Sequence, residues 1–345
     1  MKKKILSALL ATLMLATMLS GCGGKKDDST SSNGGNGSGT VSSRVWKFSH
    51  TRAEGTDNDI MANKFADSLM ENLDGLQIDM YPNNQLGDYT VVQEAVGLDE
   101  VQLMLGSMSN GVDPTLSVQI APYLVNNWDD AYEFYNSDDG IITNYVRESL
   151  EKQNIHLLAV MPKYFGAIMT TKPASNIEDP AASKGVKIRV QKSPIAVEMM
   201  KAFGGSATPV DWGELYTALQ SNVVDGAENN SPSVTTAFHH EVVKYYTVNE
   251  HTMCPDVIIL SLATWNKLSE QERGWLRQAA DEAALYQRQL WAEQEQASMV
   301  EMREKGIEII YPDKQPFVEA AQPMLDKFRN DPQFEKLIKK IEETQ

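Results

Sequence analysis

The chain is short of basic residues. Its 345 residues include 31 lysines and arginines against 47 aspartates and glutamates, so its formal charge is −16 at pH 7. We do not expect so acidic a protein to bind nucleic acid or to be held electrostatically on anionic lipid. The bulk field also repels an anionic ligand, so any anion-binding site must contain its own positive charge.

Cysteine, histidine and catalytic signatures are also scarce. There are two cysteines and five histidines. The segment 240–244 reads HEVVK, so Lys244 stands where a zinc-protease motif requires its second histidine. The chain contains neither a G-x-S-x-G nucleophile turn nor a phosphate-binding P-loop. We therefore expect no enzyme activity, no cofactor and no metal.

The only long apolar run lies at the N-terminus. Residues 1–22 combine a start rich in lysine, an apolar stretch too short to span a membrane comfortably, and the closing sequence LSGC. This pattern resembles a bacterial lipobox, which predicts an export signal and a lipid on Cys22, whereas an ordinary signal peptide with an incidental cysteine is the alternative. Removal of three lysines with the signal would lower the net charge to −16 − 3 = −19.

The segment that follows Cys22 is a predicted tether. Residues 23–43 are mostly glycine, serine, asparagine and threonine, a composition that buries too little apolar surface to fold. As a flexible coil they reach roughly 25 Å, which suits a domain held at the outer face of a membrane. With a lipid on Cys22, Cys254 is left alone, and we expect it to be a small buried apolar side chain.

About 300 residues remain, more than one core usually organises, so two lobes are expected. Segments in which apolar residues alternate, as in strands, are followed by segments in which apolar residues recur with the spacing of a helix. This succession predicts an α/β fold with a largely parallel first sheet. Segments 156–160 and 166–171 are predicted to be paired strands that cross toward the second lobe. We expect lobe I to contain residues 44–163 and 251–285, and lobe II residues 164–250 and 286–345.

Helix start signals refine this prediction. Asp211 and Glu214 form an acidic variant of the capping box, so a helix should begin near Trp212. Ser269 and Glu272 form a second capping pair, and good helix formers follow as far as residue 306. A helix of about 35 residues is about 50 Å long, which is enough to span both lobes.

The stretch 187–230 is the most informative part of the chain. Arg189 lies in the apolar strand-like segment KIRV, and a buried arginine requires a partner. Its planar guanidinium is a two-pronged donor suited to a carboxylate, although an ion pair between the lobes is an equally simple explanation. A second predicted strand, VVDG, leads to Glu228, Asn229 and Asn230.

These segments resemble the solute-binding proteins of TRAP transporters, the dicarboxylate-binding-protein-like family that passes organic acids to a membrane permease. The similar segments are KIRV (187–190), GGSATPVDWGELYTALQ (204–220), VVDGAEN (223–229) and, earlier, YPNNQLGD (81–88). The resemblance covers nearly all of the chain after residue 44. It implies a two-lobed fold of the periplasmic-binding-protein type, braced by the long helix, that closes on its ligand.

The resemblance also implies which residues contact the ligand. Arg189 would anchor a carboxylate, Asn229 would contact the ligand at a strand end, and Trp212 would wall the pocket. Each has a simpler structural role, as an ion pair, a turn residue and a core side chain respectively. Further candidates are Tyr164, Phe165, His50, Arg52, Glu54 and Asn230.

One departure from the family pattern bears on the ligand. Many members carry a second arginine in the strand before KIRV, where this chain has Ala167. A monocarboxylate such as a sugar acid or uronate is therefore expected rather than a dicarboxylate, and Arg52 is the residue that could restore a second positive charge. A binding protein of an ATP-driven transporter is the main alternative function, followed by a secreted carbohydrate-active enzyme.

Overall fold

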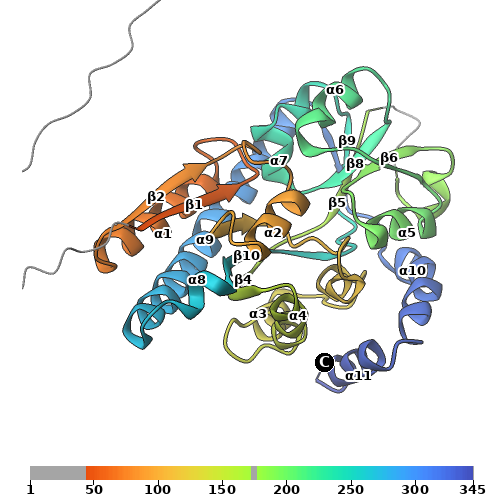
Figure 1. Cartoon of the computed structure of the whole chain (residues 1–345). Coiled ribbons are helices and arrows are strands. Elements are labelled where there is room, and N and C mark those ends of the chain that lie inside the picture. Colours follow the sequence, from red (N-terminus) through yellow and green to blue (C-terminus); the bar gives the residue numbers. More distant parts are fainter. Residues whose placement is uncertain (1–43, 172–176, 345) are drawn as a thin grey trace, which may run out of the picture. The chain divides into compact units, whose positions relative to one another are not determined.

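The computed structural model describes residues 44–171 and 177–344 (Figure 1). The predicted export signal, the lipid site at Cys22 and the tether of residues 23–43 therefore lie outside the described residues. Among the residues it describes, no helix is both long and apolar enough to cross a membrane.

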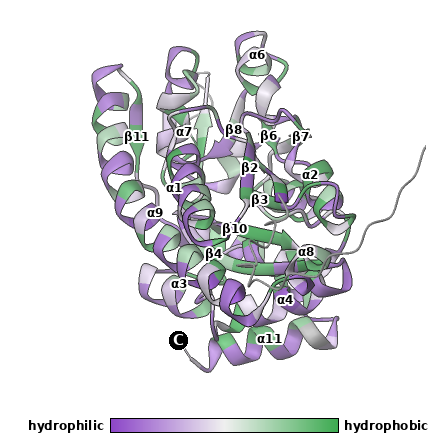
Figure 2. Cartoon of the chain, turned by 60° about the vertical axis from the view of Figure 1, so that its left-hand side comes forward, coloured by the Kyte–Doolittle hydropathy of each residue, from purple (hydrophilic) through white to green (hydrophobic). Residues whose placement is uncertain are grey.

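The first sheet has five strands in the order β2-β1-β3-β10-β4. Strand β1 runs parallel to both β2 and β3, as the succession of strands and helices predicts, but β10 is antiparallel to β3 and β4, so the sheet is mixed rather than largely parallel. Figure 2 colours β10 green, as expected for a central strand buried on both faces. The strands are β1 (Arg44–His50), β2 (Leu76–Tyr81), β3 (Leu103–Gly106), β4 (Ile155–Phe165) and β10 (Met253–Ser261).

The second sheet has six strands in the order β11-β9-β5-β8-β6-β7. Strand β6 is parallel to β7 and β8, while β5 is antiparallel to β8 and β9. The strands are β5 (Ala167–Thr170), β6 (Lys187–Val190), β7 (Ser206–Pro209), β8 (Gly226–Asn229), β9 (Tyr245–Thr247) and β11 (Glu308–Ile310).

Helices connect and cover the strands. Those between the strands of the first sheet are α1 (Asp57–Asn72), α2 (Tyr89–Gly97), η1 (Pro114–Ile120), α3 (Trp128–Phe134) and α4 (Ile141–Lys152). Those that follow β5 are η3 (Pro180–Ser183), α5 (Pro194–Ala202), η4 (Trp212–Glu214), α6 (Leu215–Gln220), α7 (Ser231–Thr236) and η5 (His239–Glu241). After β10 come α8 (Leu262–Asn266), α9 (Glu270–Glu304), α10 (Gln315–Phe328) and α11 (Pro332–Glu342).

The predicted pairing of segments 156–160 and 166–171 is wrong. These segments form β4 and β5, which belong to different sheets, and the chain passes from one to the other at Gly166. The returning strand crosses at the same place, since the Gly166 amide donates to Thr252 O (2.8 Å) and the His251 amide donates to Gly166 O (3.2 Å). A Cβ on residue 166 would lie 2.8 Å from His251 Nε2, so glycine allows the two crossings to approach.

The long helix α9 confirms its prediction. It runs over 35 residues and begins with the full capping box of Ser269 and Glu272. It packs against α1 and β4, which belong to the side of the first sheet, and against α7 and β11, which belong to the side of the second sheet. One helix therefore braces elements of both sheets, as the resemblance implied (Figures 1 and 2).

One apolar core lies against the first sheet and another against the second, and a third core contains residues of both sheets. Phe48 and Phe65 lie in the first core, Met169 and Leu219 in the second, and the third includes Leu116 and Ile188. Helix α10 packs on α5, whereas α11 packs on α4. The exact lobe boundaries remain a prediction.

Candidate ligand-binding site

A cavity lies between elements of the two sheets. It contains about 550 Å³ of space free of protein atoms, part of it open to solvent. Loops that follow the carboxyl ends of β1, β3 and β6 contribute to it, which is where α/β sheets commonly bind ligands. The lining residues are Thr51, Arg52, Asn84, Asp88, Tyr89, Ser107, Tyr164, Arg189, Gln191, Lys192, Asp211, Trp212, Glu228 and Asn229.

Arg189 is the buried cation of this cavity. It lies in β6 with 4% of its surface exposed, and its Nε donates to Val210 O at 2.8 Å. Burial lowers the pKa of Arg189, although the nearby Glu228 carboxylate acts in the opposite direction. Within the described residues its two terminal nitrogens donate to no protein acceptor. The planar end of the side chain is therefore available for a bidentate contact with a ligand carboxylate.

Arg52 brings a second guanidinium to the cavity from the loop after β1. Its Cζ lies 4.3 Å from the centre of the Trp212 ring, which comes from the start of η4 on the side of the second sheet. A cation over an indole face is a favourable contact worth about 0.5–2 kcal/mol. This contact therefore links the two sides of the cavity and positions a positive charge there.

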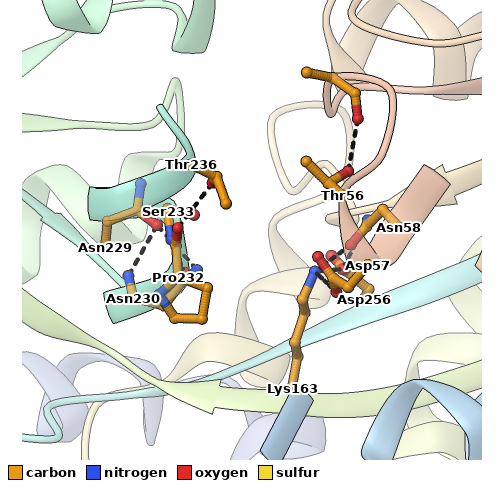
Figure 3. Close-up of polar contacts among 11 residues, drawn as sticks. Thr56, Asp57, Asn58, Lys163, Asn229, Asn230, Pro232, Ser233, Thr236 and Asp256 are labelled. Atoms are coloured by element: carbon orange, nitrogen blue, oxygen red, sulfur yellow. Dashed lines mark hydrogen bonds and ion pairs between the residues drawn. The ribbon is translucent and has the colours of Figure 1, made fainter. Parts of the chain in front are cut away.

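The loop that carries Arg52 leads into a buried charge cluster at the start of α1 (Figure 3). Lys163 of β4 is 2% exposed, and its Nζ lies 2.8 Å from Asp57 Oδ2 and 2.9 Å from Asp256 Oδ2. It also donates to Asn58 Oδ1, while Asn58 Nδ2 donates to Asp256 Oδ2 at 3.0 Å. The cluster ties the first turn of α1 to β4 and β10.

Asn229 ends β8 with its amide oriented by its neighbour. Its Oδ1 accepts hydrogen bonds from the Asn230 amide (2.9 Å) and from Asn230 Nδ2 (3.0 Å). Asn230 in turn caps α7 by accepting from the Ser233 amide at 2.8 Å (Figure 3). The oxygen of Asn229 is thus occupied, which leaves its Nδ2 as a donor at the cavity wall.

Glu228 is a buried carboxyl in the same wall. It is 3% exposed, and among the described residues it makes no hydrogen bond and no ion pair. Burial raises the pKa of Glu228 to about 7, against the opposing effect of Arg189 and Arg52. Burial likewise raises the pKa of Tyr89, which also lines the cavity, to about 12.

An ion-pair bridge lies at another part of the cavity. Lys192 Nζ is 2.8 Å from Asp211 Oδ1 and 3.5 Å from Asp88 Oδ2. Asp88 caps α2, so the lysine connects a helix of the first sheet's side with the loop before η4. The Lys192 side chain is 51% exposed, so solvent weakens this bridge.

The structure brings together five of the nine predicted ligand-contacting residues: Arg189, Asn229, Trp212, Tyr164 and Arg52. The other four do not line the cavity. His50 is 1% exposed, with its Nε2 3.2 Å from Asp59 Oδ1, and Glu54 is exposed in the loop. Phe165 packs edge-on against Trp128, and Asn230 is engaged in capping α7.

Several lining residues were missed because their local sequence suggests other roles. The helical segment begins at Trp212 as predicted, with Asp211 in the N-cap position, but the acidic capping box does not form. The Asp211 side chain makes no capping hydrogen bond and pairs with Lys192, and the first turn is the 3₁₀ helix η4, which α6 follows. The strand expected at VVDG is displaced to β8 because the amides of Val223 and Val224 donate to Ala218 O. Glu228 therefore lies within the strand.

The sequence contains a signal for some of the other residues that line the cavity. Thr51 and Ser107 directly follow β1 and β3, whose carboxyl ends lie at the same sheet edge. Asn84 lies in the turn after β2, and Tyr89 follows the helix cap Asp88. Polar residues immediately after parallel strands would have identified Thr51 and Ser107.

Comparisons with known proteins find similar sequences over most of the chain. The family model described as bacterial extracellular solute-binding protein, family 7, matches residues 48–331. A solute-binding protein of Chromohalobacter salexigens is 32% identical over 312 residues, which is 89% of this chain and 91% of the relative.

Solved structures are similar over most of the chain. A TRAP periplasmic solute-binding protein of C. salexigens with bound D-glucuronate has a TM-score of 0.82 at 30% identity, covering 87% of this chain and 100% of that one. One from Xanthobacter autotrophicus with bound β-D-galacturonate has a TM-score of 0.79 at 31% identity, covering 86% and 98%.

Proposed function

The chain belongs to family 7 of the bacterial extracellular solute-binding proteins, and from that premise we propose that it captures a sugar acid with one carboxylate, of the hexuronate type, and delivers it to a TRAP transporter. The observation that carries this proposal is the buried guanidinium of Arg189, which lines a polar cavity and whose terminal nitrogens donate to no acceptor within residues 44–171 and 177–344. The relatives with bound D-glucuronate and β-D-galacturonate support the ligand class.

The rest of the cavity suits the hydroxylated body of such a ligand. Arg189 binds the carboxylate, and Asn229 donates from its free Nδ2. Thr51, Asn84 and Gln191 add groups that can exchange hydrogen bonds with sugar hydroxyls.

The two arginines suggest how capture works. Ala167 lies in β5 beside Asn229, so the family's second arginine is absent from that strand. Arg52 supplies a second positive charge from the opposite sheet's side. An anion held between the two arginines favours the arrangement in which the lobes are closed, and so shifts the population toward it.

Calorimetric titration with D-glucuronate tests the proposal. Wild type should bind, and Arg189→Ala should lose about 2–5 kcal/mol, or roughly 30-fold to several thousand-fold in affinity, because a buried charge pair loses one partner. Arg189→Lys should also bind weakly, since an ammonium cannot form the bidentate contact. Arg303→Ala removes the same charge from the end of α9 and serves as the control. Unchanged affinity in Arg189→Ala would refute the anchor.

We also propose that the protein is a lipoprotein held at the outer face of the cell membrane. The sequence LSGC, followed by the glycine- and serine-rich residues 23–43, supports this. The tether leaves the folded domain free to meet the membrane subunits of its transporter.

Two other functions make different predictions. A secreted carbohydrate-active enzyme would convert its ligand, whereas a binding protein returns it unchanged, so NMR of D-glucuronate after prolonged incubation separates the two. A binding protein of an ATP-driven transporter would also return its ligand; the family 7 match over residues 48–331 favours a TRAP transporter instead.

A further inference from the structure

The lining of the cavity contains equal numbers of cationic and carboxyl side chains. Its lining residues include three cations, Arg52, Arg189 and Lys192, and three carboxyl groups, Asp88, Asp211 and Glu228. Two of these carboxyl groups are already paired with Lys192. Leaving Glu228 aside, the side chains that line the cavity carry 3 − 2 = 1 net positive charge, which the carboxylate of Glu228 or of a ligand can neutralise.

We propose that Glu228 determines the charge of the ligand: its carboxylate and the ligand's compete for the single net positive charge of the cavity lining, so a monocarboxylate binds with Glu228 protonated, and a Glu228 that was ionised beforehand takes up one proton on binding. This inference rests on the proposed function. It makes Glu228 a specificity-determining residue that the resemblance alone did not single out.

The position of Glu228 supports this role. It is 3% exposed on β8, whose neighbour β6 places Arg189 beside Ala227. Among the described residues nothing bonds to the Glu228 carboxylate, so no hydrogen bond favours its ionised form. An ionised carboxylate in this position depends on the field of Arg189 and Arg52, which is the same field that a ligand carboxylate would use.

No other group near Glu228 is suited to take up the proton. Tyr164, Tyr246 and Cys254 feel its charge, but burial raises their pKa values well above the ordinary ones, so they stay neutral. Tyr89 faces it from α2 and is neutral for the same reason. Strand β5 places no charged residue against β8.

The remaining charged groups around the arginines are also accounted for. Lys187, at the far end of β6, donates to Asn222 O. Asp256, which interacts with Arg52, does not line the cavity and shares the cation Lys163 with Asp57. Burial, together with the positive charges of Arg189 and Arg52, lowers the pKa of His239 to about 3, so His239 is neutral at pH 7.

The affinity for a monocarboxylate should depend on pH through the protonation of Glu228. Sugar carboxylates, like ordinary carboxyl groups, ionise near pH 3–4 and stay ionised between pH 6 and 8. The pKa of Glu228 without ligand is about 7, so Glu228 is mostly protonated at pH 6 and mostly ionised at pH 8. Since only the protonated form leaves the positive charge free, affinity should fall about tenfold from pH 6 to pH 8.

Calorimetry with D-glucuronate tests this directly. Titrations at pH 7 and pH 8 in phosphate and in Tris, whose ionisation enthalpies differ, report the protons taken up. We expect about 0.5 proton per ligand at pH 7 and close to one at pH 8. Glu228→Gln, which mimics the protonated acid, should bind with little pH dependence and no proton uptake. Glu270→Gln, which removes an exposed carboxylate at the start of α9, outside the cavity lining, should keep the uptake.

The outcomes separate the inference from the function on which it rests. Wild-type binding that is equally tight at pH 6 and pH 8, with no proton uptake, overturns the role of Glu228 and leaves the proposed function standing; this result needs no variant to fold. Absence of D-glucuronate binding at every pH overturns the proposed function itself. D-Glucarate has a second carboxylate on the same carbon chain, and tighter binding of D-glucarate than of D-glucuronate at pH 8 would refute the single positive charge.

Discussion

Replacement of Lys163 by methionine should strongly destabilise the fold. The lysine is 2% exposed, and its Nζ lies within 2.9 Å of carboxylate oxygens of both Asp57 and Asp256. Methionine fills much of the same volume but leaves two buried carboxylates without their cation. The Trp291 ring, 5.0 Å from Lys163 Nζ, loses a favourable contact as well.

The magnitude follows from the burial of the pair. Removal of one partner of a buried ion pair costs about 3–5 kcal/mol, because the remaining charge is left in a poorly solvated site. The N-terminus of α1 offsets part of the surplus negative charge, since Asp57 lies in its first turn. For a large domain, about 2 °C of melting temperature is lost per kcal/mol, so we expect a decrease of roughly 6–10 °C.

Two variants serve as controls for differential scanning calorimetry. Lys267→Met removes a lysine that is 72% exposed and paired with Asp99, so it should cost less than about 1 kcal/mol. Lys163→Met combined with Asp57→Asn and Asp256→Asn leaves no charge on these three side chains and should recover most of the loss. A decrease below about 2 °C for Lys163→Met alone would show that the cluster is not the buried ion pair described above.

The pH dependence provides an independent check. Burial by itself raises the pKa of Asp256, but Lys163 and the Asn58 amide outweigh it, so the folded pKa lies below the ordinary value. In wild type this group therefore stabilises the fold above about pH 4, and the contribution is lost as the pH falls through the folded pKa. In Lys163→Met, protonation relieves the buried carboxylates, so the penalty should shrink as the pH is lowered from 7 to 4.

Two further predictions concern the anchor and the lobes. Cys22→Ala should release the protein from the membrane fraction on cell fractionation, and a variant that stays fully bound would place the anchor elsewhere. Saturating D-glucuronate should reduce the radius of gyration measured by small-angle scattering, because the ligand holds together the sides that carry Arg52 and Arg189; an unchanged radius, with binding verified in the same sample, would exclude closure.

Local elements were predictable where their signals lie within a few residues. The long helix α9 follows from the capping box of Ser269 and Glu272 and from a run of good helix formers, and its structure agrees over the full length. Strand β2 and helix α1 follow from alternating and four-residue patterns that one buried face imposes. Such signals depend on nearby residues and not on which element packs against them.

Pairings and turn roles were not predictable in the same way. β4 and β5 have similar apolar patterns, yet they belong to different sheets because a glycine and a close chain crossing separate them. Asp211 has the spacing of a helix cap, but its side chain pairs with Lys192, which is far from it in the sequence and close to it in space. A carboxylate takes the partner that the fold brings within reach.

By itself the sequence determined the α/β character, the long helix and Arg189 as a cation in an apolar strand, because apolar periodicity and the cost of burying a charge are local properties. Only the tertiary structure decided which side chains share the cavity: it placed Arg52 on Trp212, turned His50 toward Asp59, and buried Glu228 in the field of two arginines. The physical reason is that hydrogen bonds and short-range electrostatics depend on distances of a few ångströms between residues far apart in the chain, which no local pattern records.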